Sequence, residues 1–215
     1  MICFAFASRS RPAKFFECLN NLREMAVTEY FVLAKIDDDQ KELYKGVENY
    51  SEVIVKYGRS INKVHAINRD IDQVKHPFDI LCCHSDDMFF IKKGFDILIK
   101  EHCKDDTFIH FPDQTTGDRL CSYSIMDKIY FSRFNYVYHS SYRNLWCDNE
   151  AMEVAKRLGR YKFVNEKILE HRHPINGFGV RDMQYRKTES TYWIDKRTFD
   201  IRKRHNFGLP LIQTT

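Results

Sequence analysis

An acidic pair inside an apolar stretch constrains this chain more than any other feature. Residues 79–94 read DILCCHSDDMFFIKKG, so Asp86 and Asp87 stand between two apolar runs. Desolvation disfavours an ionised carboxylate, and an acidic pair beside a buried strand therefore faces a cation or a cluster of donors. We expect the pair to lie at the carboxyl end of a central strand, 79–83, and to hold a divalent metal that carries a phosphate. A solvated turn is the alternative.

Strand-like and helix-like stretches alternate four times before this pair. Apolar, β-branched runs predict strands at residues 2–7, 30–36, 51–57 and 79–83. Helices are expected from Pro12, at 41–50, and after Ser60 as an N-cap. This alternation predicts an α/β domain with a mainly parallel sheet, in which ligands bind beyond the carboxyl ends of the strands.

The second half of the chain is less regular. The expected elements are a helix around 97–99, strands at 107–111, 161–164 and 167–169, an edge strand at 120–126, and a helix at 148–159 with Asp148 as a candidate N-cap. We interpret residues 1–180 as a single domain. Residues 181–215 form a charged and aromatic tail that we expect to pack on this domain or to become ordered on binding.

Composition limits the class of protein. The chain is 43% hydrophobic and 14% aromatic, which is typical of a packed globular protein. Its net charge of +4 weighs little for nucleic acid, and its seven cysteines lack zinc-type pairs, so they are expected to be core thiols in a reducing compartment. We find neither a signal-peptide pattern nor an apolar run near the roughly 18 to 20 residues of a membrane span, and we expect a cytoplasmic protein.

Three further polar clusters follow expected strands and suit a phosphorylated ligand. Hydroxyl and guanidinium groups at a strand-to-helix turn can bind phosphate, and an acidic turn can hydrogen-bond a ribose or a base. A solvated loop, an acidic surface turn and a polar helix face are the respective alternatives. The clusters are Ser8, Arg9 and Arg11 after the first strand, Asp38 and Asp39 after the second, and Asn62 and Lys63 after the third.

Two later segments offer catalytic or metal-binding groups. His171 and His173 alternate along an extended segment, so one of them can complete a manganese site, although a packing or surface histidine is the commoner case. Asp148 and Glu150 open the late helix after Trp146, where either can be a general base and Asp148 can equally be a structural cap.

In this order, the segments resemble a nucleotide-sugar-dependent glycosyltransferase of the GT-A fold, closest to the inverting family 2 type and its small phage-like relatives. The resemblance covers residues 2–180 and rests on SRSRP, the turn at 37–39, GRSINK, SDDM with KKGFD, WCDNE and EHRHP. It implies a Rossmann-like three-layer sandwich with a mainly parallel central sheet. SDDM departs from a strict Asp-x-Asp motif because Ser85 holds the first position, and WCDNE departs from the Glu-Asp pair common in family 2.

The resemblance also implies roles for the candidate residues. It implies Mn²⁺ or Mg²⁺ as cofactor and a nucleotide-sugar donor, with a UDP-sugar preferred. The acceptor stays open between a glycan, a lipid, a protein and a modified nucleobase. The implied assignments are nucleoside contact for Asp38 or Asp39, metal binding for Asp87 with Asp86 and for His173 or His171, diphosphate contact for Arg9, Arg11 and Lys63, and base catalysis with inversion for Asp148 or Glu150.

Two alternatives belong to other functional classes. A nucleotidyltransferase of related fold would also place acids and a divalent ion on a nucleotide, but the amino-terminal segment lacks the Gly-rich phosphate loop typical of those enzymes. A non-enzymatic nucleotide-binding or nucleic-acid-binding protein would use the basic tail at 197–204, which is interleaved with Tyr192, Trp193 and Phe199.

Overall fold

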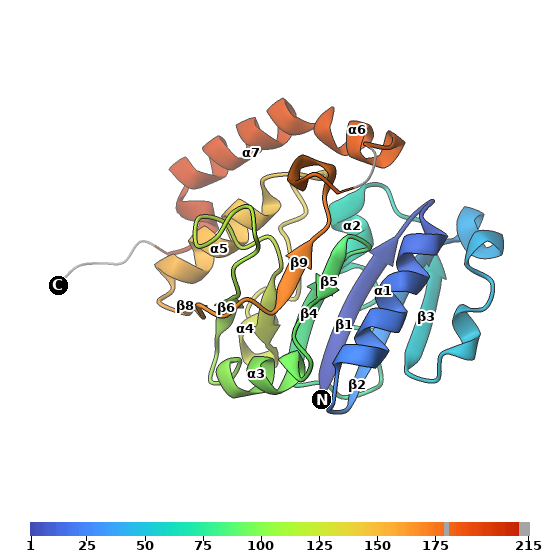
Figure 1. The fold of residues 1–215 in the computed structure, drawn as a ribbon. Coiled ribbons are helices and arrows are strands. Elements are labelled where there is room, and N and C mark those ends of the chain that lie inside the picture. Colours follow the sequence, from blue (N-terminus) through green and yellow to red (C-terminus); the bar gives the residue numbers. More distant parts are fainter. Residues whose placement is uncertain (179–180, 211–215) are drawn as a thin grey trace.

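A seven-stranded sheet forms the centre of the molecule (Figure 1). The computed structural model describes residues 1–178 and 181–210. In spatial order, the strands are β3 (Val53–Gly58), β2 (Tyr30–Asp37), β1 (Ile2–Ser8), β4 (Ile80–His84), β7 (Ile125–Asp127), β6 (Phe108–His110) and β8 (Tyr161–Phe163). In this part of the chain β7 alone runs against the other six strands, and the expected mainly parallel sheet is confirmed.

Helices cover both faces of the sheet, as the expected three-layer sandwich requires. α1 (Pro12–Met25) and α3 (Phe95–His102) pack with the core of one face. The core of the other face packs against α2 (Lys63–Asn68), α4 (Lys128–Ser132) and α5 (Cys147–Arg157). Successive side chains of β1 point to opposite faces of the sheet and so enter the two cores in turn. Ile2, Phe4 and Phe6 belong to one core, and Cys3 and Ala5 belong to the other.

Several local expectations were wrong. The stretch expected to be a helix at 41–50 forms two short 3₁₀ segments, Asp38–Tyr44 and Val47–Asn49, separated near Gly46, whose φ of 95° interrupts a helix. The stretch expected to be an edge strand at 120–126 contributes β7, which lies inside the sheet between β4 and β6. Local periodicity carries no information about which neighbours a strand finds.

Two N-caps also differ from the expectation. Asn62, rather than Ser60, caps α2, because its side chain accepts a hydrogen bond from the His65 amide. α5 begins at Cys147 after Trp146, whose φ is 63°, so Asp148 lies inside the first turn and is not the N-cap. A carboxylate there still interacts favourably with the amino-terminal end of the helix.

A second, small sheet joins the acidic pair to the later histidines. β5 (Met88–Phe90) directly follows Asp87 and pairs antiparallel with β9 (Leu169–His171). The register places Met88 opposite His171. Residues about 80 positions apart in the sequence therefore meet at the carboxyl end of β4.

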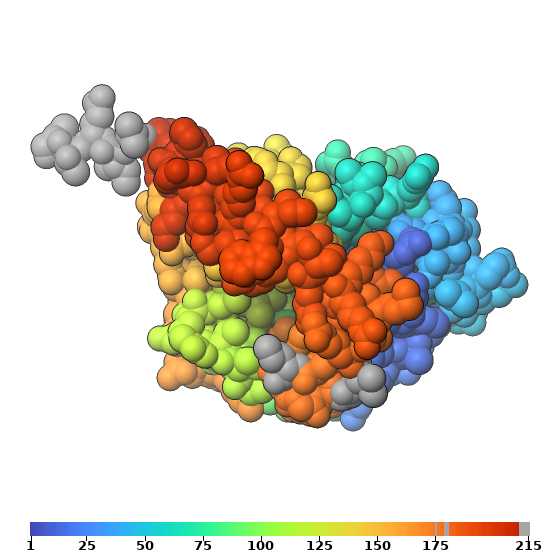
Figure 2. All heavy atoms as spheres, turned by 90° about the horizontal axis from the view of Figure 1, so that it is seen from above, coloured from blue at the N-terminus to red at the C-terminus, as the bar shows by residue number. Residues whose placement is uncertain are grey.

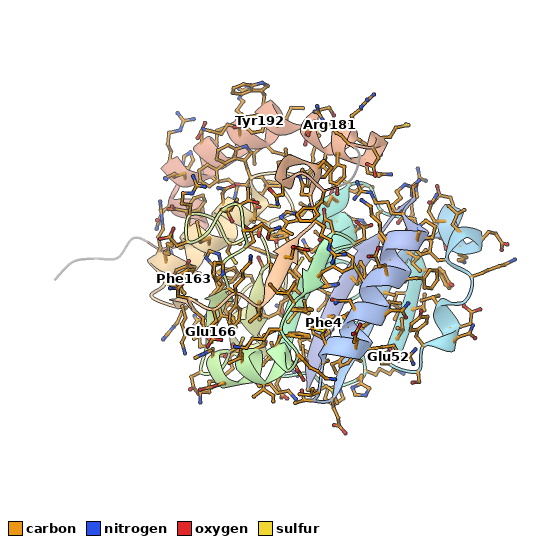
Figure 3. All side chains as sticks on the ribbon, in the orientation of Figure 1. Phe4, Glu52, Phe163, Glu166, Arg181 and Tyr192 are labelled. Carbon is orange, nitrogen blue, oxygen red and sulfur yellow. The ribbon has the colours of Figure 1, made fainter. Side chains whose placement is uncertain are left out.

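The carboxyl-terminal part forms two helices, α6 (Met183–Glu189) and α7 (Tyr192–Arg204), beyond the carboxyl edge of the sheet (Figure 1). Arg181 and Tyr192 mark this side of the molecule in Figure 3. Within the expected tail of 181–215, residues 211–215 lie outside the described residues, as do residues 179–180 just before it. The helices of the described chain include none that is long and apolar enough to cross a membrane.

Asp195 fixes α7 to the loop that precedes α5. Asp195 is fully buried. Its side chain accepts hydrogen bonds from the backbone amides of residues 143, 144 and 145 at 2.9, 3.0 and 2.9 Å. Arg202, near the carboxyl end of the same helix, donates to both carboxylate oxygens of Glu150 in α5. These contacts make α7 part of the support for α5.

We expect Asp195→Ala to lower the free energy of unfolding by about 3 kcal/mol or more, because three backbone amides lose a charged acceptor that is fully buried. Urea unfolding followed by circular dichroism measures this loss. Asp200→Ala on the same helix is the control: Asp200 pairs with Lys196 at the surface, where its loss costs about 1 kcal/mol or less. Equal effects of the two substitutions would contradict the assigned role of Asp195.

Candidate active site

The carboxyl ends of neighbouring parallel strands bring the expected polar clusters to one edge of the sheet. Ser8 ends β1, Asp37 ends β2, and Ser85 follows β4. Figure 2 looks down on this face and shows a hollow between the lime-coloured loop after β6, the orange segment around β9 and the red helix α7. Such an edge is where open α/β sheets bind their ligands.

Asp86 is buried and is held by β1 and by the loop after it. Its two carboxylate oxygens accept hydrogen bonds from Ser8 Oγ at 2.9 Å and from Arg11 Nη1 at 3.0 Å. Burial and the adjacent Asp87 raise the pKa of Asp86, and Arg11 acts in the opposite direction. Asp86 therefore has a structural partner on each oxygen, and its charge depends on Arg11.

Asp87 is also buried, but it is surrounded by donors of a different kind. Ser85 Oγ donates to its Oδ1 at 2.5 Å, and the Tyr185 hydroxyl from α6 donates to its Oδ2 at 3.1 Å. Burial acts to raise the pKa of Asp87, but hydrogen bonding and the positive charge of His171 outweigh it and hold the pKa well below the usual range. Asp87 is thus ionised at neutral pH.

His171 stands between two carboxylates. Its Nε2 lies 3.6 Å from Asp87 Oδ2, and its Nδ1 lies 3.5 Å from Asp113 Oδ2. Burial acts to lower the pKa of the imidazole, but Asp113 and Asp87 outweigh it and raise the pKa to about 9. Each ring nitrogen therefore has a defined partner, which fixes the orientation of the ring.

The loop after β6 orients His171, and sequence reasoning missed it. The Asp113 side chain is fully buried, with Oδ1 accepting from the amides of Thr115 and Thr116 and Oδ2 accepting from Ser122 Oγ at 2.6 Å. Gln114 binds both the backbone amide and the backbone carbonyl of His171. The signal available in the sequence was an aspartate after an expected strand, followed by the turn-forming residues 114–117.

Lys63 and Asp148 lie close enough to the acidic pair and His171 to interact with them: Asp87 acts on Lys63, and His171 acts on Asp148. Lys63 is exposed and Asp148 is partly exposed, although protein atoms surround both, as expected of groups on the wall of a cleft. The surrounding protein acts to lower the pKa of Lys63, but its negative neighbours, including Asp87 and Asp148, raise it. Burial raises the pKa of Asp148, against the influence of Lys63. The cleft therefore holds a cation and a carboxylate of increased basicity.

α6 closes one side of this arrangement. Arg11 makes a two-pronged contact with Asp182, at 2.8 and 2.7 Å, while its guanidinium lies 4.0 Å from the centre of the Tyr185 ring. The His173 ring packs edge-on against Tyr185 at 4.4 Å, and burial lowers the pKa of His173 to about 4. Asp182 and Tyr185, which sequence reasoning also missed, thus connect the tail to the acidic pair.

Other expected site residues have different partners. Arg9 is held by Asp37 and Asp39, so its guanidinium is engaged by the acidic turn. Asp38 is exposed and pairs with Lys41 at 3.1 Å. The Asn62 side chain serves as the α2 cap. Glu150, the alternative base, is taken up by Arg202 and by the Tyr142 hydroxyl.

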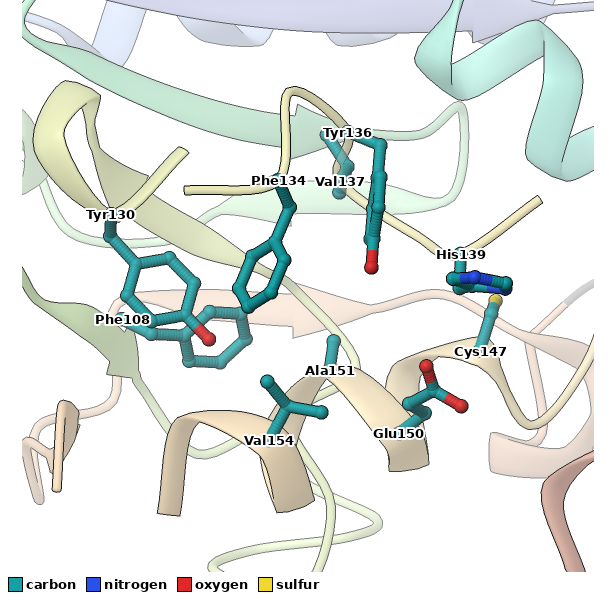
Figure 4. Close-up of a pocket in the computed structure, with 10 residues that line it drawn as sticks. All are labelled: Phe108, Tyr130, Phe134, Tyr136, Val137, His139, Cys147, Glu150, Ala151 and Val154. Atoms are coloured by element: carbon teal, nitrogen blue, oxygen red, sulfur yellow. The ribbon is translucent and has the colours of Figure 1, made fainter. Parts of the chain in front are cut away.

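A small pocket behind α5 is too small for a nucleotide. Its volume is about 20 Å³, which is room for about one water molecule. Figure 4 shows aromatic side chains from β6, α4 and the following segment around it, with Glu150 and Tyr136 pointing into it. A second, more open pocket of about 480 Å³ lies at the start of β4, where Asp79, Lys104 and Asp127 line it. Neither pocket contains the acidic pair.

The donors at the cleft fit a divalent cation that is shared with a ligand. Among the described residues, no group of three or more His, Cys, Asp or Glu side chains is arranged to hold a metal ion. Asp87 and the Nε2 atom of His171 nevertheless face each other, and Asp113 on the far nitrogen supplies the outer carboxylate that metal-bound histidines commonly have. Mn²⁺ accepts both donor types, and substrate phosphates supply further oxygens in such sites.

Comparisons with known proteins identify the fold. No protein-family model and no curated protein sequence matches this chain. Among solved structures, the mannosyltransferase PcManGT from Pyrobaculum calidifontis, in complex with GDP-mannose and Mn²⁺, is similar with a TM-score of 0.68 and 11% identity. The match covers 94% of this chain and 64% of that chain, so this chain spans less than two thirds of that protein.

Two further structures show the breadth of the likeness. S. aureus TarS 1–349 in complex with UDP-GlcNAc has a TM-score of 0.62 at 10% identity, covering 87% of this chain and 64% of that chain. The 4-diphosphocytidyl-2C-methyl-D-erythritol synthase from Anaerococcus prevotii has a TM-score of 0.55 at 11% identity, covering 78% and 87%. The resemblance to GT-A-type glycosyltransferases that the sequence suggested is confirmed at the level of the fold.

The raised pKa of His171 predicts how stability depends on pH. The folded pKa of about 9 exceeds the ordinary value of 6.5. The imidazolium therefore stabilises the metal-free protein fully below pH 6.5, and this stabilisation is lost as the pH rises through 9. We expect His171→Gln to reduce the free energy of unfolding by at least about 1 kcal/mol near pH 6 and by little near pH 10.

Urea unfolding in EDTA at several pH values measures this difference. His205→Gln, which alters an exposed histidine, is the control and should show no such trend. A His171→Gln deficit that does not change with pH would show that His171 is not held as an imidazolium between the two carboxylates.

Proposed function

We propose that this protein is a metal-dependent glycosyltransferase that moves a sugar from a nucleotide-sugar to an acceptor hydroxyl. One observation carries the proposal: Asp87 and His171 face each other at the end of β4, and Lys63 and Asp148 are close enough to interact with them electrostatically. This places two metal-binding donors, a cation for phosphate and a basic carboxylate around one space. The GT-A fold, which includes enzymes that bind nucleotide-sugars, supports it.

Asp87 and His171 would hold Mn²⁺ or Mg²⁺, and His171 would release the proton that it carries in the metal-free protein. When bound, the ion would act as a Lewis acid that stabilises the charge developing on the departing nucleoside diphosphate. Asp86 would not be a direct ligand, because the guanidinium cation of Arg11 binds its Oδ1, whereas the hydrogen bonds that Asp87 accepts come from the neutral hydroxyls of Ser85 and Tyr185. Instead, Asp86 would keep Arg11 in place at the edge of the site.

Lys63 is the available cation for the diphosphate. The residue is exposed, and the structure gives it negative neighbours rather than a closed ion pair, so its ammonium is available to phosphate oxygens. Asp182 binds the Nε and Nη2 edge of Arg11. If Asp182 releases that edge, Arg11 can also bind the diphosphate. Arg9 would instead hold the acidic turn at Asp37 and Asp39, where the nucleoside is expected.

Asp148 would accept the proton of the acceptor hydroxyl as the oxygen attacks the anomeric carbon. Burial raises its pKa, which makes the carboxylate a better base at neutral pH. Glu150 is unsuited to this step, because Arg202 and Tyr142 occupy its oxygens. Attack from the face opposite the diphosphate would invert the anomeric centre.

Asp87→Asn tests the metal assignment. We expect the wild type to be stabilised by a nucleoside diphosphate only when Mn²⁺ is present, and the variant to lose this stabilisation because one ligand of the ion is gone. Thermal shift measurements with UDP and GDP, with and without Mn²⁺, provide the readout. Asp72→Asn, at an exposed position, is the control. Metal-dependent stabilisation of the Asp87 variant at the wild-type level would refute the assignment.

Asp148→Asn tests the base. The variant should retain metal-dependent nucleotide binding and lose transfer by about 10²- to 10⁴-fold, because it cannot take the proton. Isothermal titration measures binding, and release of nucleoside diphosphate from a sugar nucleotide measures turnover. If binding is lost together with turnover, Asp148 has a structural role. If pyrophosphate is formed from a nucleoside triphosphate and a sugar phosphate, the protein is a nucleotidyltransferase.

A further inference from the structure

Exposed apolar side chains gather on the carboxyl-terminal helices. In the part of the chain that the structure describes, five of the twelve exposed large apolar side chains lie between residues 183 and 201. Met183 is 82% exposed and Trp193 is 78% exposed. The other seven are spread over residues 27–129. A local concentration of exposed apolar groups marks an interaction surface, whereas isolated ones do not. The five residues are Met183, Tyr192, Trp193, Ile194 and Ile201.

The outer face of α7 combines these apolar groups with basic ones. Asp195 and Phe199 are the buried side of the helix and face the rest of the protein. Residues three or four positions apart lie on one face of a helix, and this spacing relates residues 193, 197, 201 and 204. Their face is the one opposite Asp195 and Phe199. That face therefore presents Trp193, Arg197, Ile201 and Arg204 in a single row. Together with Met183 and Ile194 we call this the α6–α7 surface.

The charge of this region selects an anionic partner. Residues 181–210 contain eight basic and four acidic residues, an excess of four positive charges that equals the net charge of the whole chain. Asp195 is buried, Asp182 binds Arg11 and Arg202 is held by Glu150, so seven basic and two acidic residues of the region remain for a partner. A second copy of the chain is a poor partner, because a symmetric contact would set the two basic rows against each other.

We propose that the α6–α7 surface docks onto an anionic phospholipid surface. Aliphatic Met183, Ile194 and Ile201 find no counterpart in a phosphate backbone, whereas they lose contact with water at the boundary between headgroups and acyl chains. Arginine and lysine next to them reach the lipid phosphates, and tryptophan suits an interface that is apolar on one side and wet on the other. Nucleic acid would use the charges and leave the aliphatic groups exposed.

Docking in this way would turn the cleft toward the lipid. The hollow and the helices α6 and α7 lie on the same face of the molecule in Figure 2. α6 is also part of the cleft, because Tyr185 donates to Asp87. An acceptor displayed at a lipid surface would then approach the cleft directly. That consequence rests on the proposed function, but the docking itself does not.

Sedimentation with lipid vesicles tests the docking without any activity measurement. The protein should bind vesicles of phosphatidylcholine mixed with phosphatidylglycerol and not vesicles of phosphatidylcholine alone. Trp193→Ala with Ile201→Ser should weaken binding by at least about tenfold, and so should Arg197→Glu with Arg204→Glu. These four side chains are on the outer face of α7, and circular dichroism confirms that the variants are folded.

A matched control uses the same chemistry at the opposite end of the molecule. Lys93→Glu with Ile97→Ser alters an exposed lysine and an exposed isoleucine at α3 and should bind vesicles like the wild type. Absence of binding to anionic vesicles, or equal binding by the α3 and α7 variants, would overturn the proposal. So would an oligonucleotide that binds more tightly than the vesicles and displaces them, or a stable dimer that the α7 substitutions dissociate.

Discussion

Burying two adjacent carboxylates at the end of β4 is the constraint on which the rest of this site depends. Each carboxylate needs donors, and the chain cannot supply them locally apart from Ser85. Asp86 takes Ser8 and Arg11 from the end of β1, and Asp87 takes His171 from β9 and Tyr185 from α6. The partners of the pair therefore bring the end of β1, β9 and α6 together at the end of β4, and these elements form the floor of the cleft.

The two acids end with different chemistry although they are neighbours. Asp86 is satisfied by a serine and an arginine and has a raised pKa, whereas Asp87 has a lowered pKa and faces an imidazole. That difference makes Asp87 the metal-binding candidate and Asp86 a positioning residue for Arg11. A second difference separates Asp148 from Glu150: both lie in the first turn of α5, but only Asp148 opens to the cleft, because Arg202 holds Glu150.

The carboxyl-terminal helices connect the site to the surface. Asp195 in α7 holds the backbone of residues 143–145, and that loop in turn accepts a hydrogen bond from Val64 in α2 through the Arg143 carbonyl. The loop that Asp195 holds therefore contacts the start of α2, which carries Lys63, and leads directly into α5, which carries Asp148. On its outer side the same helix carries the apolar and basic row of the α6–α7 surface, so anything that engages this row also bears on the elements that hold the cleft.

The sequence by itself determined the parts that depend on local periodicity and on chain order. The alternation of Ile2, Phe4 and Phe6 with smaller residues specified a strand buried on both faces, and four alternating strands and helices specified where the acidic pair would end up. Only the tertiary structure decided which side chains complete the site. Tyr185 lies 98 residues from Asp87, and Asp182 lies 171 residues from Arg11. No local pattern encodes such partners, because they are selected by the charge that folding buries.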